Sequence, residues 1–172
     1  SWFKRVVMEG ESTQYVNEPD FKGRIAPVSL RTQTIVPGKA QGRLIGGNLT
    51  VLAHLVGTPY LPDMSGRILF LEDVHEGIYR IDRMLTHLKL AGLLSKIKGF
   101  IWGQCSDCEP DSSGYGSLTI EEVLDDHIKP LKVPTYRGAM IGHIDKQFTV
   151  PEGIEAEMDA DTGTFRLMES AV

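Results

Sequence analysis

A short apolar stretch that leads into two acidic residues and then a helical pattern constrains the fold more than any other part of the chain. Residues 67–71 (RILFL) predict a buried strand, because four consecutive apolar residues have the length and composition of one, and Glu72 and Asp73 follow directly. Beyond them, apolar side chains recur at the three- and four-residue intervals of a helix with one buried face. These side chains are Ile78, Ile81, Met84, Leu85, Leu88 and Ala91. The pattern predicts a strand followed by a helix that ends at Gly92.

Further strands and helices are expected on both sides of this unit. Alternating residues around Asp161-Thr162-Gly163 indicate a hairpin near the end of the chain. This mixture of strands and helices predicts an α/β domain with a mixed sheet, helices and a C-terminal β-hairpin. The other expected elements are the end of a helix in 1–10, a connector in 11–23, one or two strands in 24–38, a strand, a glycine turn and a short helix capped by Asn48 in 42–59, a strand in 99–103, a loop in 104–117, a helix from about Thr119 to just before Pro130, and a strand with a glycine turn before His143.

The composition is that of a globular chain and excludes several classes of partner. With 172 residues, the chain fits one domain that can bury a core. Its formal net charge of -5 gives no electrostatic reason to expect nucleic acid or an anionic membrane as a partner. No apolar run approaches the length of a membrane span, and residues 1–20 lack a signal-peptide core. Two cysteines are too few for a disulfide-stapled scaffold, so a reducing compartment is expected.

Glu72 and His143 are the first candidates for chemistry. A carboxylate is costly to bury unless a partner pairs with it, and His143 follows a predicted strand and a glycine in a loop where functional residues often lie. A carboxylate that holds one imidazole nitrogen fixes the tautomer and leaves the other nitrogen free as a base. The alternative is that Glu72 caps the following helix and His143 only satisfies a turn.

The sequence offers no obvious nucleophile for such a base. It contains no G-x-S-x-G motif, and the glycine-rich stretch at 112–117 (SSGYGS) resembles a flexible loop. The chain also opens with SWFKRVV, without a methionine or a polar leader, as expected of a piece of a longer protein. Either Glu72 and His143 have no catalytic task, or the nucleophile lies on a missing N-terminal part.

Cys105 and Cys108 form a C-x-x-C motif after a predicted strand. Such a pair can be a redox site or one half of a zinc site. A structural zinc needs two more ligands at a suitable spacing, and no second C-x-x-C or H-x-x-x-H motif is present. The prediction is therefore two free thiols at the mouth of a loop, with no bound metal.

Five further residues are weaker candidates for substrate binding. Gly46, Gly47 and Asn48 precede a predicted helix and could cradle an anion there, although a tight turn between strand and helix explains them equally well. Tyr79 and Arg83 lie one helical turn apart, so they share a face and could reach the same cleft. Ordinary surface or packing roles are the alternative for both.

Three segments together resemble a known family. They are residues 42–94 (GRLIGGNLTVLAHLVGTPYLPDMSGRILFLEDVHEGIYRIDRMLTHLKLAGLL), 99–105 (GFIWGQC) and 141–153 (IGHIDKQFTVPEG). They resemble the C-terminal domain of the LD-carboxypeptidases, the serine peptidases that include murein tetrapeptide carboxypeptidases and microcin-immunity peptidases. The resemblance implies a Ser-Glu-His triad in which Glu72 of the LFLED segment orients His143 of the IGH segment. The serine and the oxyanion-hole amides of the family belong to a separate N-terminal domain, which this chain lacks.

The resemblance also implies the organisation and activity of the protein. Residues 1–22 would be a connector and the end of a preceding helix, and residues 23–172 would be a C-terminal domain similar to the swivelling β/β/α architecture. The family releases a terminal D-amino acid, typically D-alanine from murein tetrapeptide in cytoplasmic peptidoglycan recycling, and its substrates also include peptide-nucleotide antibiotics. It uses no metal or organic cofactor and often forms homodimers. The isolated chain is expected to be inactive.

Two other classes of protein remain open from the sequence. One is a non-catalytic module of the same fold that binds peptides or dimerises. The other is a metal or redox module built on Cys105 and Cys108. Of the three classes, only a domain of an LD-carboxypeptidase gives Glu72 and His143 a shared chemical role.

Overall fold

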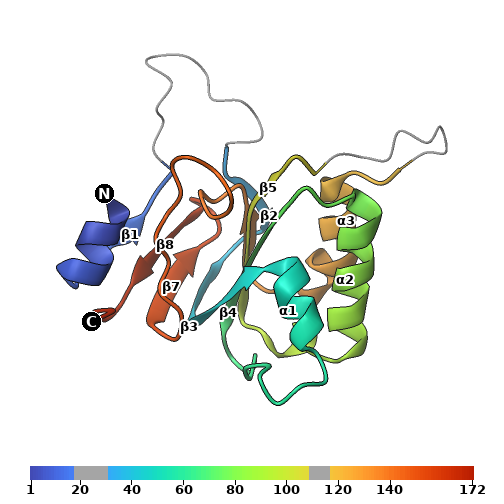
Figure 1. Cartoon of the computed structure of the whole chain (residues 1–172), viewed down its shortest axis with the longest axis horizontal. Coiled ribbons are helices and arrows are strands. Elements are labelled where there is room, and N and C mark those ends of the chain that lie inside the picture. The colour runs from blue at the N-terminus through green and yellow to red at the C-terminus, as the bar shows by residue number, and fades with distance from the viewer. Residues whose placement is uncertain (18–30, 109–116) are drawn as a thin grey trace.

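A computed structural model describes residues 1–17, 31–108 and 117–172 (Figure 1). Its strands form one mixed sheet of eight strands in the order β1-β8-β7-β3-β4-β5-β6-β2. The strands are β1 (Gln14–Tyr15), β2 (Gln33–Val36), β3 (Lys39–Asn48), β4 (Ile68–Val74), β5 (Gly99–Ser106), β6 (Thr135–Arg137), β7 (Glu155–Asp159) and β8 (Thr164–Leu167). The helices are α1 (Leu49–Leu55), α2 (Ile78–Leu90) and α3 (Ile120–His127), with short helical turns η1 (Lys4–Met8), η3 (Leu94–Lys96) and η4 (Lys129–Leu131).

The long strand β3 joins two parts of the sheet. Its first half, Lys39 to Arg43, pairs antiparallel with β7, and its second half, Leu44 to Asn48, pairs parallel with β4. Strands β4, β5 and β6 continue the parallel arrangement. The carboxyl ends of these parallel strands therefore meet at one edge of the sheet, which is where open α/β sheets usually hold their functional residues.

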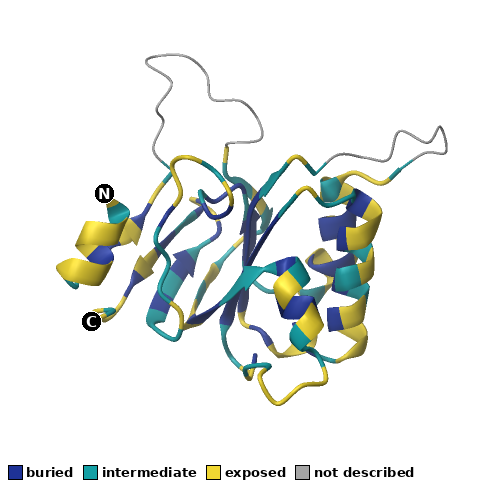
Figure 2. Cartoon of the chain, in the orientation of Figure 1, coloured by how far each residue is buried: buried dark blue, intermediate teal, exposed yellow. Residues whose placement is uncertain are grey.

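The helices cover one face of the parallel part of the sheet (Figure 1), and each face has its own apolar core. The predicted helical face is confirmed in α2, whose residues Ile78, Ile81, Leu85 and Leu88 are buried against the sheet. Ala91 of the predicted face is exposed, because α2 ends at Leu90. Figure 2 shows the resulting pattern, with buried residues lining the inner sides of the helices and strands.

The predicted hairpin is confirmed by β7 and β8, which pair antiparallel on either side of the turn containing Asp161-Thr162-Gly163. The predicted helix near Thr119 is also confirmed. Thr119 and Glu122 form a reciprocal capping box at the start of α3, in which the Thr119 hydroxyl accepts from the Glu122 N–H.

Two segments that the sequence predicts to be irregular contain strand residues. The described part of the expected connector contains β1, which pairs with β8, because Tyr15 stacks on Phe165 and Trp2 in turn stacks on Tyr15. The expected loop over 104–117 begins later, because β5 continues through Ser106 beside β4. The rest of that loop, residues 109–116, and the part of the connector after residue 17 lie outside the described residues.

Within the described ranges, no helix has both the length and the apolar character needed to cross a membrane.

Candidate functional site

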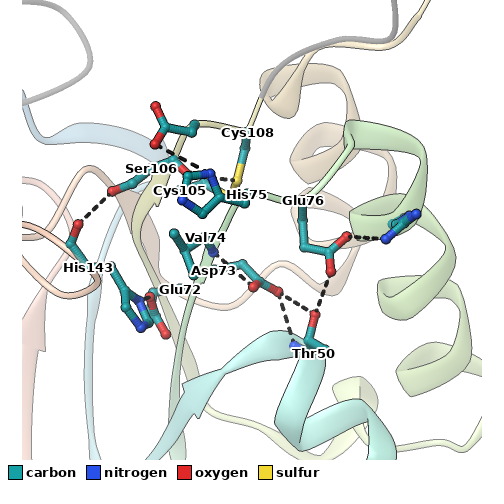
Figure 3. The surroundings of a disulfide bond; sticks show 12 residues. Thr50, Glu72, Asp73, Val74, His75, Glu76, Cys105, Ser106, Cys108 and His143 are labelled. Carbon is teal, nitrogen blue, oxygen red and sulfur yellow. Dashed lines mark hydrogen bonds and ion pairs between the residues drawn. A yellow bond between two sulfur atoms is a disulfide. The ribbon is translucent and has the colours of Figure 1, made fainter.

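The candidate site lies where β4 reaches the edge of the parallel sheet. Successive side chains of a strand point to opposite faces, so Glu72 and Asp73 leave β4 in different directions (Figure 3). Only 6% of the Glu72 surface and 2% of the Asp73 surface are exposed. Two buried carboxylates at one strand end each require hydrogen-bond partners, and each finds them on its own face of the sheet.

Glu72 meets His143, as the sequence predicts. Oε2 of Glu72 lies 2.8 Å from Nδ1 of His143, although 71 residues separate the two in the chain (Figure 3). A carboxylate can only accept a hydrogen bond, so Nδ1 carries the proton, and in the neutral imidazole the lone pair is then on Nε2. The His143 side chain is 57% exposed, and Nε2 has no hydrogen-bond partner among the described residues. The arrangement is an oriented imidazole with an accessible basic nitrogen.

The loop that carries His143 is fixed against the end of β5. The Gln104 N–H donates to the Ile141 carbonyl at 2.7 Å, and the Ser106 hydroxyl donates to the His143 carbonyl at 3.0 Å. Gly142 has a φ of +133°, and a Cβ there would lie 3.2 Å from Oε2 of Glu72. Glycine is therefore needed at this position both for the backbone conformation and for the close approach of the two functional residues.

Asp73 has a structural task on the helix face of the sheet. Its carboxylate accepts from the Asn48 side-chain amide at 3.0 Å, from the Thr50 N–H at 3.0 Å and from the Thr50 hydroxyl at 2.9 Å. It also accepts from the N–H of Val74 at 2.9 Å. These contacts tie the start of α1 to the end of β4. The sequence alone predicts no role for Asp73, since its only signal there is a second acid at the end of an apolar run.

The glycine turn predicted at Gly46 and Gly47 is wrong, because β3 continues through both residues beside β4. Gly46 is required there since a Cβ would overlap the carbonyl oxygen of Phe70. The predicted helix cap at Asn48 is confirmed, with its side-chain oxygen accepting from the Val51 N–H at 3.1 Å. These contacts give Gly46 and Asn48 structural tasks, and substrate binding by Gly46, Gly47 and Asn48 stays a prediction.

Tyr79 and Arg83 are both exposed on α2, and the Arg83 guanidinium lies 6.0 Å from the centre of the Tyr79 ring. Arg83 lines a groove of about 490 Å³ between α1 and α2, together with Thr50 and Glu76. Glu72 and His143 do not line this groove. The structure thus brings Tyr79 and Arg83 together, but on the helix side of the sheet, and their part in substrate binding stays a prediction.

The prediction of two free thiols is wrong, because Cys105 and Cys108 form a disulfide (Figure 3). The turn after β5 brings their Cα atoms to 5.5 Å, a separation that a disulfide spans. No group of three or more His, Cys, Asp or Glu side chains within the described ranges is placed to hold a metal ion.

An α/β domain with a carboxylate-oriented imidazole at the edge of its parallel strands has the acid–base part of a hydrolase site. Comparison with known proteins agrees with this class. Residues 41–158 match the model of the LD-carboxypeptidase C-terminal domain. The chain therefore belongs to the LD-carboxypeptidase family, as the sequence resemblance indicated.

Relatives and solved structures support the same family. A probable murein peptide carboxypeptidase from Bacillus subtilis is 42% identical over 125 residues, which cover 73% of this chain and 39% of that protein. The crystal structure of muramoyltetrapeptide carboxypeptidase from Oxalobacter formigenes matches with a TM-score of 0.67 and 37% identity, over 80% of this chain and 49% of that one. The microcin C7 self-immunity protein MccF, as an inactive mutant without ligand, matches with a TM-score of 0.73 and 26% identity. This match covers 92% of this chain and 48% of the MccF chain. The chain spans less than half the length of each of these proteins.

Proposed function

We propose that residues 23–172 are the C-terminal domain of a serine-type LD-carboxypeptidase and contribute Glu72 and His143 to a Ser-Glu-His triad. Residues 1–22 would then be a connector and the end of a preceding helix, and a separate N-terminal domain would carry the serine. The observation that supports this most directly is the 2.8 Å hydrogen bond between Oε2 of Glu72 and Nδ1 of His143. The length of the relatives, more than twice that of the matching part, is consistent with a second domain.

The geometry suggests a role for each residue in an acyl-transfer reaction. Nε2 of His143 takes the proton from the serine hydroxyl as the serine oxygen attacks the carbonyl carbon of the scissile bond. The same nitrogen then gives that proton to the leaving amine as the C–N bond breaks. A water molecule, deprotonated by the same imidazole, hydrolyses the acyl-enzyme and regenerates the serine. Glu72 accepts from Nδ1–H throughout and stabilises the imidazolium form.

The proposed substrate is a murein tetrapeptide from which a terminal D-alanine is released. The support is the naming of two relatives as murein peptide and muramoyltetrapeptide carboxypeptidases. The same proposal places the enzyme in the cytoplasm, where murein fragments are recycled, and gives it no metal or organic cofactor. Assembly into a homodimer stays a prediction, which light scattering of the purified protein would check.

The test is release of free D-alanine, measured by chromatography, from a tetrapeptide substrate. The chain alone should show no turnover, because it would lack the nucleophile and the oxyanion-hole amides. Fusion to the N-terminal domain of the B. subtilis relative should produce turnover, and His143→Ala in that fusion should lower kcat by at least about 10⁴-fold. His87→Ala is the matched control, since His87 is exposed on α2 and should leave kcat unchanged. Turnover by the isolated chain, or a fully active His143→Ala fusion, would contradict the proposal.

A further inference from the structure

The last residues of β5 form a support for the loop that carries His143. Gln104 and Ser106 lie two residues apart on β5, and they bond to the carbonyls of Ile141 and His143, which are also two residues apart. The first contact is made by a backbone N–H, but the second depends on the Ser106 side-chain hydroxyl. The backbone of His143 is thus held at its carbonyl by one serine, while its ring is held by Glu72.

Ser106 is itself held in place on three sides. It pairs with Val74 of β4, and its carbonyl accepts from the N–H of His75 at 2.9 Å. The disulfide between Cys105 and Cys108 closes a ring that contains Ser106 and Asp107 (Figure 3). Asp107 has a φ of +56°, a left-handed conformation that costs energy in a residue with a side chain, so the closed ring holds a turn that the open chain would resist.

We propose that the Cys105–Cys108 pair is a redox-controlled clamp on the acid–base site. In the disulfide form it keeps the Ser106 hydroxyl on the His143 carbonyl, and in the dithiol form it releases Ser106 and lets the imidazole leave its fixed orientation. The step is a thiol–disulfide exchange with a dithiol reductant. The reductant gives two electrons and two protons, the Cys105–Cys108 bond breaks to two thiols, and the reductant becomes a disulfide. The catalytic consequence rests on the proposed function, whereas the structural consequence does not.

Three observations favour a switch over a structural staple. The ring spans only four residues, and a disulfide that closes so short a loop contributes less to global stability than one that closes a long loop. Both cysteines are partly exposed, so a dithiol can reach them. The β4–β5 pairing and the Gln104 contact do not involve the sulfur atoms, so the sheet can persist when the ring opens. Disulfides in a reducing compartment are usually transient or redox-sensing, which fits the proposed cytoplasmic location.

The test is NMR of the 172-residue chain with labelled histidine, recorded before and after reduction with dithiothreitol. The imidazole ¹⁵N shifts of His143 report which ring nitrogen carries the proton. In the disulfide form the Nδ1–H tautomer bonded to Glu72 should dominate. Reduction should shift the signals toward a mixture of tautomers, and Cys105→Ser/Cys108→Ser should match the reduced protein. Identical His143 signals in the oxidised and reduced chains would overturn the proposal.

Variants at position 106 separate the hydroxyl from the disulfide. Ser106→Ala keeps both cysteines but should give the mixed tautomer signals in either redox state, while Ser106→Thr, which retains a hydroxyl, should restore the redox dependence. Ser95→Ala is the matched control, because the Ser95 hydroxyl also donates to a backbone carbonyl, that of Gly92 at 3.1 Å. Ser95 lies in η3, before the start of β5, whereas Ser106 is the last residue of β5. A redox response that persists in full in Ser106→Ala would show that the clamp does not act through this hydroxyl.

Kinetics of the two-domain fusion then test the catalytic consequence. Reduction should lower kcat by up to about 100-fold with little change in KM, as expected when a catalytic group is misplaced by about 1 Å. The two proposals can fail separately. An inactive fusion with redox-dependent His143 signals would overturn the proposed function alone, and an active fusion with redox-independent signals would overturn the clamp alone.

Discussion

Glu72 and Asp73 are neighbours on β4, yet their carboxylates serve opposite faces of the sheet: Glu72 holds His143, and Asp73 holds the start of α1. Successive side chains of a strand point to opposite faces of the sheet, so two adjacent acids at one strand end can bind different partners. One acid belongs to the candidate chemistry and the other to the stability of the scaffold around it. The two roles can be tested separately.

Asp73→Asn should destabilise the protein without removing the Glu72–His143 pair. The amide would lose the charge and replace one carboxylate oxygen by an NH₂ group, so that either the Thr50 N–H or the Val74 N–H, which bond to different oxygens of Asp73, would lose its acceptor. The expected loss is about 1–3 kcal/mol of unfolding free energy, measured by urea denaturation. Asp63→Asn, in an exposed loop, is the control and should cost much less. Equal stabilities of the two variants would show that the buried carboxylate does not anchor α1.

Gly46→Ala and Gly47→Ala should differ sharply in stability. Both glycines have a positive φ, so both variants carry backbone strain. A Cβ at Gly46 would overlap the carbonyl of Phe70, whereas at Gly47 the nearest atom would be Oε1 of Glu152 at 3.8 Å. Gly46→Ala should therefore lose about 1–3 kcal/mol more than Gly47→Ala, by thermal unfolding followed with circular dichroism. If Gly47→Ala proved the more damaging, the close approach of β3 and β4 would be refuted.

Glu152 should make stability depend on pH. Desolvation raises the pKa of its carboxyl group above the ordinary value, so the folded protein binds this proton more tightly than the unfolded chain does. The contribution of Glu152 to stability is therefore lost as the pH rises through its folded-state pKa. Glu152→Gln should raise Tm relative to the parent more at about pH 7.5 than at about pH 4.

The control for that measurement is Glu9→Gln. Glu9 and Glu152 are both exposed, but Glu9 pairs with Lys4 at the surface, where ion pairs contribute little. Its effect on Tm should be small at both pH values. A Glu152→Gln effect that is the same at both pH values would contradict the raised pKa.

Local sequence patterns predicted much of this fold. The periodicity that ends at Gly92 predicted α2, the turn around Asp161 predicted the β7–β8 hairpin, and Asn48 and Thr119 are the caps of α1 and α3. These features depend on contacts between residues close together in the chain, so the sequence carries them directly. The pairing of Glu72 with His143 could be predicted because both residues follow predicted strands and because the family resemblance implies that they form a pair.

Features that depend on contacts between residues distant in the chain could not be predicted from the sequence. Gly46 and Gly47 have the composition of a turn, but the carbonyl of Phe70, 24 residues after Gly46 in the sequence, explains why no side chain fits at Gly46. A C-x-x-C motif suits a metal, a redox pair or a disulfide equally well, and only the fold after β5 brings Cys105 and Cys108 together. The role of Asp73 likewise depends on where α1 starts.

The kcat of Glu72→Gln in the two-domain fusion shows whether Glu72 acts by orienting His143. Glutamine keeps the size of the side chain but can offer its amide nitrogen to Nδ1, which favours the wrong tautomer. We expect kcat for D-alanine release to fall by roughly 10⁴-fold with little change in KM, as for the equivalent change in other serine peptidases. Glu157→Gln, which removes a carboxylate paired with Arg166 on the hairpin, should leave kcat unchanged. A Glu72→Gln enzyme with the kcat of the parent would show that Glu72 does not act by orienting His143.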